Sequence, residues 1–342
     1  MKAAVLLKKG PSKDALKIQE VPDVHPAQGQ VRIKVECFGL NYADVMARNG
    51  LYDAAPKMPC VVGYEVVGII DEIGQDVPKD MMAKRVVAFT RFGGYAEYAV
   101  TSWEACAKIG EMNAGEACAI AVQYATAYYM AYDAINLHPG DKVMIHAGAG
   151  GVGTALIQLC KLKECEIFAN AGSEEKLKYM KSQGADHVIN YREKDYAVEI
   201  PKILGVKKLQ ATFNPIAGST FKKDLKLLGA GGKLLLFGGS ERSGKRWGMF
   251  SSLNFVRKMG LMIPIGLVMS SKSVLGVNML NIGDDEPEIL RRCMTEVVKL
   301  VLEGKLKPHI GGEFTAENIA EAHDLLESRK SIGKIVVYWS NN

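Results

Sequence analysis

The stretch Gly148-Ala149-Gly150-Gly151-Val152-Gly153 lies between an apolar run and a segment whose apolar residues have helical spacing. The run before it, Lys142–Ala147, is typical of a buried parallel strand, and Thr154–Lys163 after it predicts a helix. Glycines let the backbone turn tightly and approach a ligand, and a helix start offers free N–H groups to an anion. Strand, turn and helix in this order predict a site for the pyrophosphate of a dinucleotide. The alternative is a tight turn that only packs a helix against a sheet. The candidate binding residues of the turn are Gly148, Gly150, Gly151, Val152 and Gly153.

Strands and helices alternate on both sides of this turn. Helical segments separate six short apolar runs, and two of these runs follow Gly-Ala or Gly-Gly pairs. Such an alternation predicts an α/β domain with a doubly wound parallel sheet, which binds its ligand at the carboxyl ends of the strands. We assign this domain to residues 123–280. The predicted strands are Lys142–Ala147, Glu166–Ala171, Asp186–Asn190, Ala211–Asn214, Lys233–Phe237 and Ser273–Met279.

The segments that flank this domain have a different pattern. Residues 1–122 contain short runs of strand composition between turn residues, such as Val31–Val35, which alternates with a period of two. After residue 281, two helical patterns, Glu288–Glu303 and Ala316–Ser328, precede a final strand, Lys334–Trp339. Because the nucleotide-binding unit is already complete, we expect residues 281–342 to return to the β-rich domain formed by residues 1–122.

Composition excludes several classes of protein. The chain of 342 residues is 48% hydrophobic and 24% charged, as in ordinary globular proteins. Its net charge of +5 is well below that of a nucleic-acid-binding domain. The longest apolar stretch, 260–269, contains Pro264 and is shorter than the roughly 20 residues that span a membrane. The seven cysteines form no C-x-x-C pair, which predicts reduced thiols in a cytoplasmic protein.

The end of the second predicted strand bears on the choice of cofactor. In NAD-binding domains an acidic residue at this point binds the ribose hydroxyls, but this chain has Asn170 and Ala171 there. A carboxylate would repel a 2′-phosphate, whereas a hydroxyl or a cation would bind it. The missing acid therefore favours NADPH; the alternative is that Glu174 or Glu175 binds the ribose. The candidate residues for the phosphate are Ser173, Lys176 and Tyr191, with Arg192 beside them.

Several motifs resemble those of the zinc-independent quinone oxidoreductases, which belong to the medium-chain dehydrogenase/reductase superfamily. They are F-G-L-N-Y-A-D-V-M-A-R-N-G-L-Y (38–52), P-C-V-V-G-Y-E-V-V-G (59–68), F-G-G-Y-A-E-Y (92–98), A-T-A-Y (125–128), H-P-G-D-K-V-M-I-H-A-G-A-G-G-V-G (138–153) and I-G-K-I-V-V (332–337). Within this family the segments 43–53 and 304–310 are most similar to the vesicle-amine-transport-protein-like branch. The resemblance implies a GroES-like substrate domain, a Rossmann coenzyme domain, a cleft between them and a homodimer. It also implies NADPH-dependent reduction of quinones or other α,β-unsaturated carbonyls.

The resemblance further implies the residues of the site. Zinc-dependent relatives have a Cys at Asn41 and a His at Tyr64, and Glu65 alone cannot hold zinc, so we expect no metal. Tyr52 is expected to donate a hydrogen bond to the acceptor oxygen, with a packed aromatic ring as the alternative. At position 214 the family usually has Asp. The Asn of this chain is expected to change the hydrogen bonds near the nicotinamide. The residues expected to contact the cofactor here are Asn41, Thr126, Asn214, Phe237, Gly238, Gly239 and Lys334; Asn41 and Tyr52 are the catalytic candidates.

Other features of the chain leave alternatives open. A quinone or enone already delocalises incoming negative charge, so we expect a small apolar conjugated substrate. A second hypothesis is an NADPH-binding protein that uses an apolar cleft for lipid or partner binding, with little turnover. The segment 241–258 mixes cations with aromatic residues and predicts an ordinary loop and helix, with a substrate lid or a membrane-surface patch as alternatives. Asp44 and Arg48 are expected to form a structural pair, and the six histidines are expected to have structural roles.

Overall fold

The computed structural model describes residues 1–242, 255–260 and 262–339, so most of the predicted lid segment, 243–254, lies outside the described residues. The chain divides into two compact units. The first, here the terminal unit, consists of Met1–Thr126 and Met279–Asn342. The second, here the central unit, is Ala127–Asn278.

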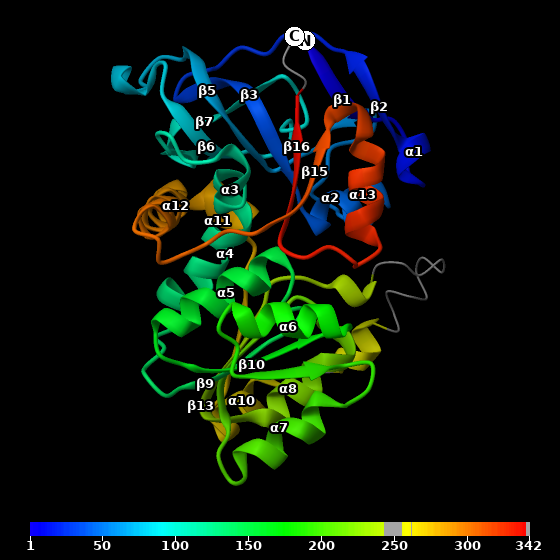
Figure 1. The fold of residues 1–342 in the computed structure, drawn as a ribbon, viewed down its shortest axis with the longest axis vertical. Coiled ribbons are helices and arrows are strands. Elements are labelled where there is room, and N and C mark those ends of the chain that lie inside the picture. Colours follow the sequence, from blue (N-terminus) through cyan, green and yellow to red (C-terminus); the bar gives the residue numbers. More distant parts are fainter. Residues whose placement is uncertain (243–254, 261, 340–342) are drawn as a thin grey trace. The chain divides into compact units, whose positions relative to one another are not determined.

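The central unit is built on a six-stranded sheet, of which β9, β10 and β13 are labelled in Figure 1. The strand order is β11-β10-β9-β12-β13-β14, and all neighbouring strands are parallel. Counted along the chain this order is 3-2-1-4-5-6, which is the Rossmann arrangement, with its switch point between β9 and β12. The predicted doubly wound sheet is thereby confirmed. The strands are β9 (Lys142–Ile145), β10 (Glu166–Ala171), β11 (His187–Asn190), β12 (Leu209–Asn214), β13 (Leu228–Leu236) and β14 (Ser273–Gly276).

Several boundaries in the central unit differ from the prediction; β9 ends at Ile145, and β14 ends at Gly276, before Met279 begins α11. Two other differences involve glycines. Helix α5 begins at Gly151, because the last residues of the glycine turn form its first turn. Strand β13 begins at Leu228, and its register shifts across the glycine-rich residues 229–232 before it pairs regularly from Lys233. The helices are η4 (Tyr129–Asp133), α5 (Gly151–Leu162), α6 (Glu174–Ser182), α7 (Tyr196–Leu204), η5 (Gly218–Thr220), α8 (Phe221–Leu227), η6 (Ser240–Arg242) and α10 (Pro264–Ser270).

The terminal unit contains two sheets. The larger has the order β15-β16-β3-β5-β6-β8, with β7 also paired to β3, and the smaller has the order β2-β1-β4. Strand β16 pairs antiparallel with β3, for example Val337 with Phe38, so the C-terminal segment completes the sheet of the N-terminal one. The strands are β1 (Lys2–Leu6), β2 (Leu16–Glu20), β3 (Gln30–Leu40), β4 (Cys60–Val61), β5 (Glu65–Ile73), β6 (Arg85–Phe89), β7 (Tyr98–Ser102), β8 (Cys106–Lys108), β15 (Ile310–Thr315) and β16 (Lys334–Tyr338).

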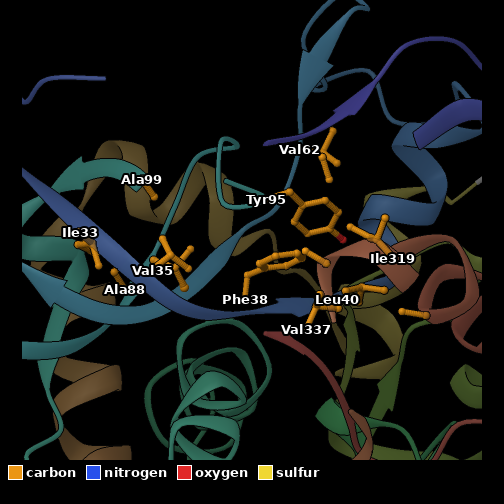
Figure 2. Close-up of a cluster of buried hydrophobic side chains, with 14 of the residues drawn as sticks. Ile33, Val35, Phe38, Leu40, Val62, Ala88, Tyr95, Ala99, Ile319 and Val337 are labelled. Atoms are coloured by element: carbon orange, nitrogen blue, oxygen red, sulfur yellow. The ribbon is translucent and has the colours of Figure 1, made fainter. Parts of the chain in front are cut away.

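A hydrophobic core joins these strands to the C-terminal helix α13. Figure 2 shows Phe38 beside Tyr95, with Leu40, Val337 and Ile319 around them. The Phe38 and Tyr95 ring centroids lie 4.6 Å apart, and both side chains are fully buried. This packing fixes the carboxyl end of β3, which leads directly into the candidate residue Asn41.

The helices of the terminal unit are short except for α12. The helical pattern predicted around 117–136 is an irregular succession in which the wider π-helical turns η3 and η4 flank α4. Within the described ranges, no helix is long and apolar enough to cross a membrane. The helices are α1 (Ser12–Ala15), α2 (Tyr42–Arg48), η1 (Lys79–Met81), η2 (Trp103–Ala105), α3 (Ala114–Cys118), η3 (Ile120–Tyr124), α4 (Ala125–Tyr128), α11 (Met279–Asp285), α12 (Pro287–Leu302), η7 (Ala316–Asn318) and α13 (Ile319–Glu327).

Candidate active site

The glycine turn connects the end of β9 to the start of α5. A Cβ atom on Gly153 would lie 2.4 Å from the carbonyl oxygen of Ala147, and one on Gly148 would lie 2.5 Å from the sulfur of Met180. A side chain at Gly153 would therefore push α5 away from the end of β9, whereas one at Gly148 would displace the side chain of Met180 on α6. The first turn of α5 contains no acidic residue, and the N–H groups of residues 151–153 have no carbonyl partner within the helix. The turn is thus shaped to bind an anion through backbone N–H groups.

The end of β10 is a polar and cationic corner. Gly172 packs so closely that a Cβ there would lie 2.7 Å from the hydroxyl oxygen of Tyr191 and 3.1 Å from Nε of Arg192. Partial burial lowers the pKa of the Lys176 ammonium; Glu175 opposes this effect, and the charge of Arg192 adds to it. Ser173 precedes α6 without using its hydroxyl as a helix cap. Tyr191 and Arg192 therefore lie against Gly172, which precedes Ser173, and the charge of Arg192 acts on Lys176.

The residues at the ends of β12 and β13 differ in their availability to a ligand. Asn214 is fully buried: its Oδ1 accepts hydrogen bonds from the N–H groups of Ile216 and Ala217 at 2.8 and 2.9 Å. Its Nδ2 donates to side chains of α8 and η5, so any effect of Asn214 on a cofactor is indirect. A Cβ on Gly238 would lie 2.8 Å from the carbonyl oxygen of Pro215. Phe237 is half-buried, and a Cβ on Gly239 would meet only the ring of Phe255, at 3.5 Å. Both residues therefore have room for a ligand contact.

In the terminal unit, Asn41, Glu65 and Lys334 form a buried polar cluster. The Lys334 ammonium is fully buried, forms an ion pair with Glu65 and donates to Oδ1 of Asn41 at 3.2 Å. Nδ2 of Asn41 donates to Oε1 of Glu65 at 2.7 Å, and Oε2 of Glu65 accepts the N–H of Val122 at 3.0 Å. The positive charge of the Lys334 ammonium balances the negative charge of the Glu65 carboxylate. One hydrogen of Nδ2 on Asn41 is not used in these bonds, whereas Lys334 has no exposed surface with which to meet a cofactor directly.

Tyr52 belongs to an aromatic group with Tyr64. The rings stand edge to face, with centroids 6.1 Å apart, and Phe92 lies 5.1 Å from Tyr64 on the same measure. Burial, and to a smaller extent the charge of Asp44, raises the pKa of the Tyr52 hydroxyl, so it stays protonated and can donate a hydrogen bond. The hydroxyl of Tyr64 is buried without a hydrogen-bond partner among the described residues. Thr126, the last residue of this unit's first segment, is buried and donates to the carbonyl of Val122 at 2.5 Å.

The predicted pair of Asp44 and Arg48 is wrong. Asp44 accepts the N–H of Asn41 at 2.8 Å, and burial raises its pKa to about 7. Arg48 is also buried and forms its ion pair with Glu327 of α13. The two residues lie one helical turn apart, but α13 supplies Arg48 with a carboxylate of its own. Both side chains are structural: Asp44 holds the start of α2, and Arg48 ties α2 to α13.

The residues of the candidate site do not fit a metal ion. Across the described part of the chain, no three His, Cys, Asp or Glu side chains gather as a metal site. Both carboxylate oxygens of Glu65 already accept hydrogen bonds: Oε1 from the Lys334 ammonium and the Asn41 amide, and Oε2 from a backbone N–H. A tetrahedral zinc site needs Cys or His donors, and Asn41 and Tyr64 are neither.

Two families match the chain. Residues 27–111 match the alcohol dehydrogenase GroES-like domain, and residues 151–295 match the family described as zinc-binding dehydrogenase. The chain therefore belongs to the medium-chain dehydrogenase/reductase superfamily, in which it lies close to the VAT-1 homologs and the quinone oxidoreductases. The family resemblance and the GroES-like plus Rossmann fold expected from the motifs are confirmed.

Individual relatives cover nearly the whole chain. It is 34% identical over 329 residues to the synaptic vesicle membrane protein VAT-1 homolog of Danio rerio, a match that spans 95% of this chain and 67% of that protein. It is 29% identical over 315 residues to human quinone oxidoreductase, across 91% of this chain and 90% of that protein. A mycobacterial protein solved in complex with NADPH superimposes with a TM-score of 0.86 at 26% identity, over 99% of this chain and 100% of that one.

Proposed function

We propose that the chain is an NADPH-dependent reductase of quinones and other α,β-unsaturated carbonyls that acts without zinc. The observation that carries the proposal is the cationic end of β10, where Lys176, Arg192 and Tyr191 gather beside Gly172 and the strand ends without an acid. A 2′-phosphate is the group that such a corner recognises. The similarity to human quinone oxidoreductase and to a protein solved with NADPH supports the same reading.

The residues of each unit have separate tasks in this proposal. The N–H groups of residues 151–153 bind the pyrophosphate, and Ser173, Lys176 and Tyr191 bind the 2′-phosphate. In the central unit, Phe237, Gly238 and Gly239 are the candidates to contact the nicotinamide. In the terminal unit, the candidates are Asn41 and Thr126. Lys334 acts indirectly, because its ammonium holds Glu65 and the amide of Asn41 in place.

The acceptor is reduced by a hydride and a proton. NADPH, when bound, supplies the hydride. A conjugated acceptor spreads the incoming negative charge, so it needs hydrogen bonds and positioning instead of a Lewis acid. Tyr52, whose raised pKa keeps its hydroxyl protonated, donates a hydrogen bond to the acceptor oxygen. Solvent supplies the proton that completes the reduction. A simple ketone lacks the conjugation and is a poor substrate.

Removal of metal should leave the protein unchanged. Because Lys334 already neutralises Glu65, we expect extensive dialysis against a strong chelator to alter neither the melting temperature nor the rate of quinone reduction. Metal analysis of the purified protein is the accompanying control. Zinc bound at one ion per chain, or activity that returns only when zinc is added, would contradict the proposal.

We also propose that the protein forms a homodimer through the β14 edge of the central sheet. Strand β14 ends the sheet, with a pairing to β13 alone among the described residues. The adjoining helix α10 buries none of its residues and exposes 60% of Ile265, 71% of Val268 and 83% of Met269. An unpaired strand edge beside an apolar helix is a surface that a second copy can cover.

Charge on α10 should therefore dissociate the dimer. We expect the double variant Val268→Asp, Met269→Asp to have the 37.2 kDa mass of a single chain in light scattering, and the native protein twice that mass. Val206→Asp is the matched control, since Val206 is 97% exposed but lies far along the chain from α10. A native protein that stays monomeric at micromolar concentration sinks this proposal.

A second candidate function is favoured by the VAT-1 homologs among the relatives. In it, the chain binds NADPH but uses its apolar surfaces for a lipid or a protein partner and has little turnover. The two candidates differ in one measurement. Tight NADPH binding without oxidation by any member of a quinone and enone panel supports the second.

A further inference from the structure

Five buried polar side chains form a continuous network beneath the glycine turn. They come from different elements of the central unit: His146 follows β9, Asn170 lies near the end of β10, Asn214 ends β12, Tyr196 begins α7 and Asp224 lies in α8. His146, Asn214 and Asp224 are fully buried, and Asn170 and Tyr196 are exposed by 2% and 5%. Buried polar groups are costly unless each finds its hydrogen-bond partner, so the pattern of donors and acceptors here is strongly determined.

The orientation of Asn170 shows which nitrogen of His146 carries the proton. The N–H of Ala147 can only donate, and it meets Oδ1 of Asn170 at 3.2 Å. Nδ2 of Asn170 must then face Nδ1 of His146, at 3.1 Å, as a donor. Nδ1 of His146 is therefore an acceptor without a proton. The imidazole carries its single proton on Nε2, which lies 3.0 Å from both carboxylate oxygens of Asp224.

Asp224 receives hydrogen bonds from three directions. Besides His146, the hydroxyl of Tyr196 donates to Oδ1 at 2.8 Å, and Nδ2 of Asn214 donates to Oδ2 at 2.6 Å. The two N–H groups on Oδ1 of Asn214 fix the direction of its amide, so Nδ2 necessarily faces Asp224. The family resemblance places an aspartate at position 214, but in this chain the carboxylate is at 224 and the amide at 214. Carboxylates at both positions would repel each other.

The network ends at the residue that starts the glycine turn. Ala147 has φ +52°, a left-handed conformation that is strained for a residue with a side chain. Asn170 holds it from two sides, since Oδ1 accepts the Ala147 N–H and the backbone oxygen accepts the Gly148 N–H at 3.1 Å. The carbonyl of Ala147 in turn accepts the N–H of Gly150 at 2.9 Å, one residue before α5 begins. The conformation of Ala147 therefore sets where the N–H groups of α5 point.

We propose that Asp224 is a positioning residue for cofactor binding. Through its acceptor oxygens it keeps His146 in the Nε2–H form, His146 orients Asn170, and Asn170 holds Ala147 in the conformation that presents the first turn of α5 to the pyrophosphate. Asn214 completes the arrangement as the donor to Asp224. This inference rests on the proposed binding of NADPH, but the network itself consists of contacts within the central unit.

An exchange of the two side chains tests the pairing. In Asp224→Asn, one acceptor oxygen becomes an NH2 group that faces a donor, and we expect the Kd for NADPH to rise by about tenfold to a hundredfold. Asn214→Asp places a second carboxylate against that of Asp224. Because the two repel each other, this variant should weaken NADPH binding to a similar extent. The double variant restores a complementary pair: the new carboxylate at position 214 accepts from the amide at position 224, whose oxygen still accepts from His146 and Tyr196. We expect its Kd to return to within about threefold of the native value.

Two further readouts separate positioning from general stability. Nitrogen-15 NMR of the imidazole, assigned with a His146→Gln variant, should show one protonated nitrogen, Nε2, at neutral pH in the native protein and in the double variant. Melting temperatures identify variants that merely lose stability, and Kd values are measured well below them. The inference is overturned if Asp224→Asn binds NADPH as the native protein does, if the double variant binds as weakly as the single ones, or if His146 of the native protein is protonated on Nδ1. Failure of the native protein to bind NADPH overturns the proposed function instead, and the imidazole spectrum still decides the network.

Discussion

We expect replacement of Tyr52 by Phe to lower the rate of quinone reduction by about ten- to a thousandfold and to leave the Kd for NADPH nearly unchanged. The substitution keeps the ring, and so the edge-to-face contact with Tyr64, while it removes the hydroxyl. A donor to the acceptor oxygen matters most when negative charge develops there, which is in the transition state. The loss should therefore appear mainly in kcat, as measured by steady-state NADPH oxidation with a small quinone.

The control for this experiment is Tyr98→Phe. Tyr98 lies on β7 in the same unit, and its ring packs under the guanidinium of Arg32 at 5.1 Å. This variant also loses a tyrosine hydroxyl, but away from the candidate site. We expect it to reduce the quinone at the native rate. A native rate in Tyr52→Phe would assign Tyr52 to packing alone, and the hydrogen bond to the acceptor would then come from another group.

Lys176→Ala should reduce the preference for NADPH over NADH by about tenfold to a hundredfold, because a charge-assisted hydrogen bond to a phosphate contributes about 1.5–3 kcal/mol. The effect should fall on NADPH alone, since NADH has no 2′-phosphate. Arg192 stays beside Gly172 in this variant, so part of the preference should survive. The measurement is the Kd of each cofactor by fluorescence titration, at a fixed low ionic strength because salt screens such contacts.

Lys178 provides the matched control for Lys176. It lies on the same helix, α6, but its side chain is exposed. Lys178→Ala therefore removes one positive charge from α6 and leaves Lys176 in place. We expect this variant to keep the native ratio of the two dissociation constants. If the native protein binds NADH and NADPH equally well, the interpretation of the β10 corner is wrong.

The sequence predicted the central unit well because its pattern is local. Each strand of the Rossmann sheet is a short apolar run bounded by turn residues, and the alternation with helices indicates that the strands are parallel. The order of the strands was not predicted. Two of the boundary errors lie where glycines fit either element: α5 includes the last residues of the turn, and β13 starts before its glycine-rich bulge. Another error is the end of β14, which stops at Gly276 and not at Met279.

The side-chain partners were much harder to predict, because they join distant positions. Nothing near Lys334 in the sequence shows that its ammonium pairs with Glu65, a residue 269 positions away. Arg48 likewise finds its carboxylate on α13, not one turn away at Asp44. His146 lies within the motif 138–153, but that motif does not indicate its partners, and only the folded sheet brings it between Asn170 and Asp224. Asn214 was the one signal, since the family usually has an aspartate there.

The most direct test of the central claim is the oxidation of NADPH by the metal-free protein in the presence of a matched set of acceptors. We expect steady consumption of NADPH with quinones and enones, one NADPH for each acceptor reduced by two electrons, and almost none with an unconjugated ketone of similar size. Efficient reduction of the simple ketone while quinones and enones remain inert would contradict the account.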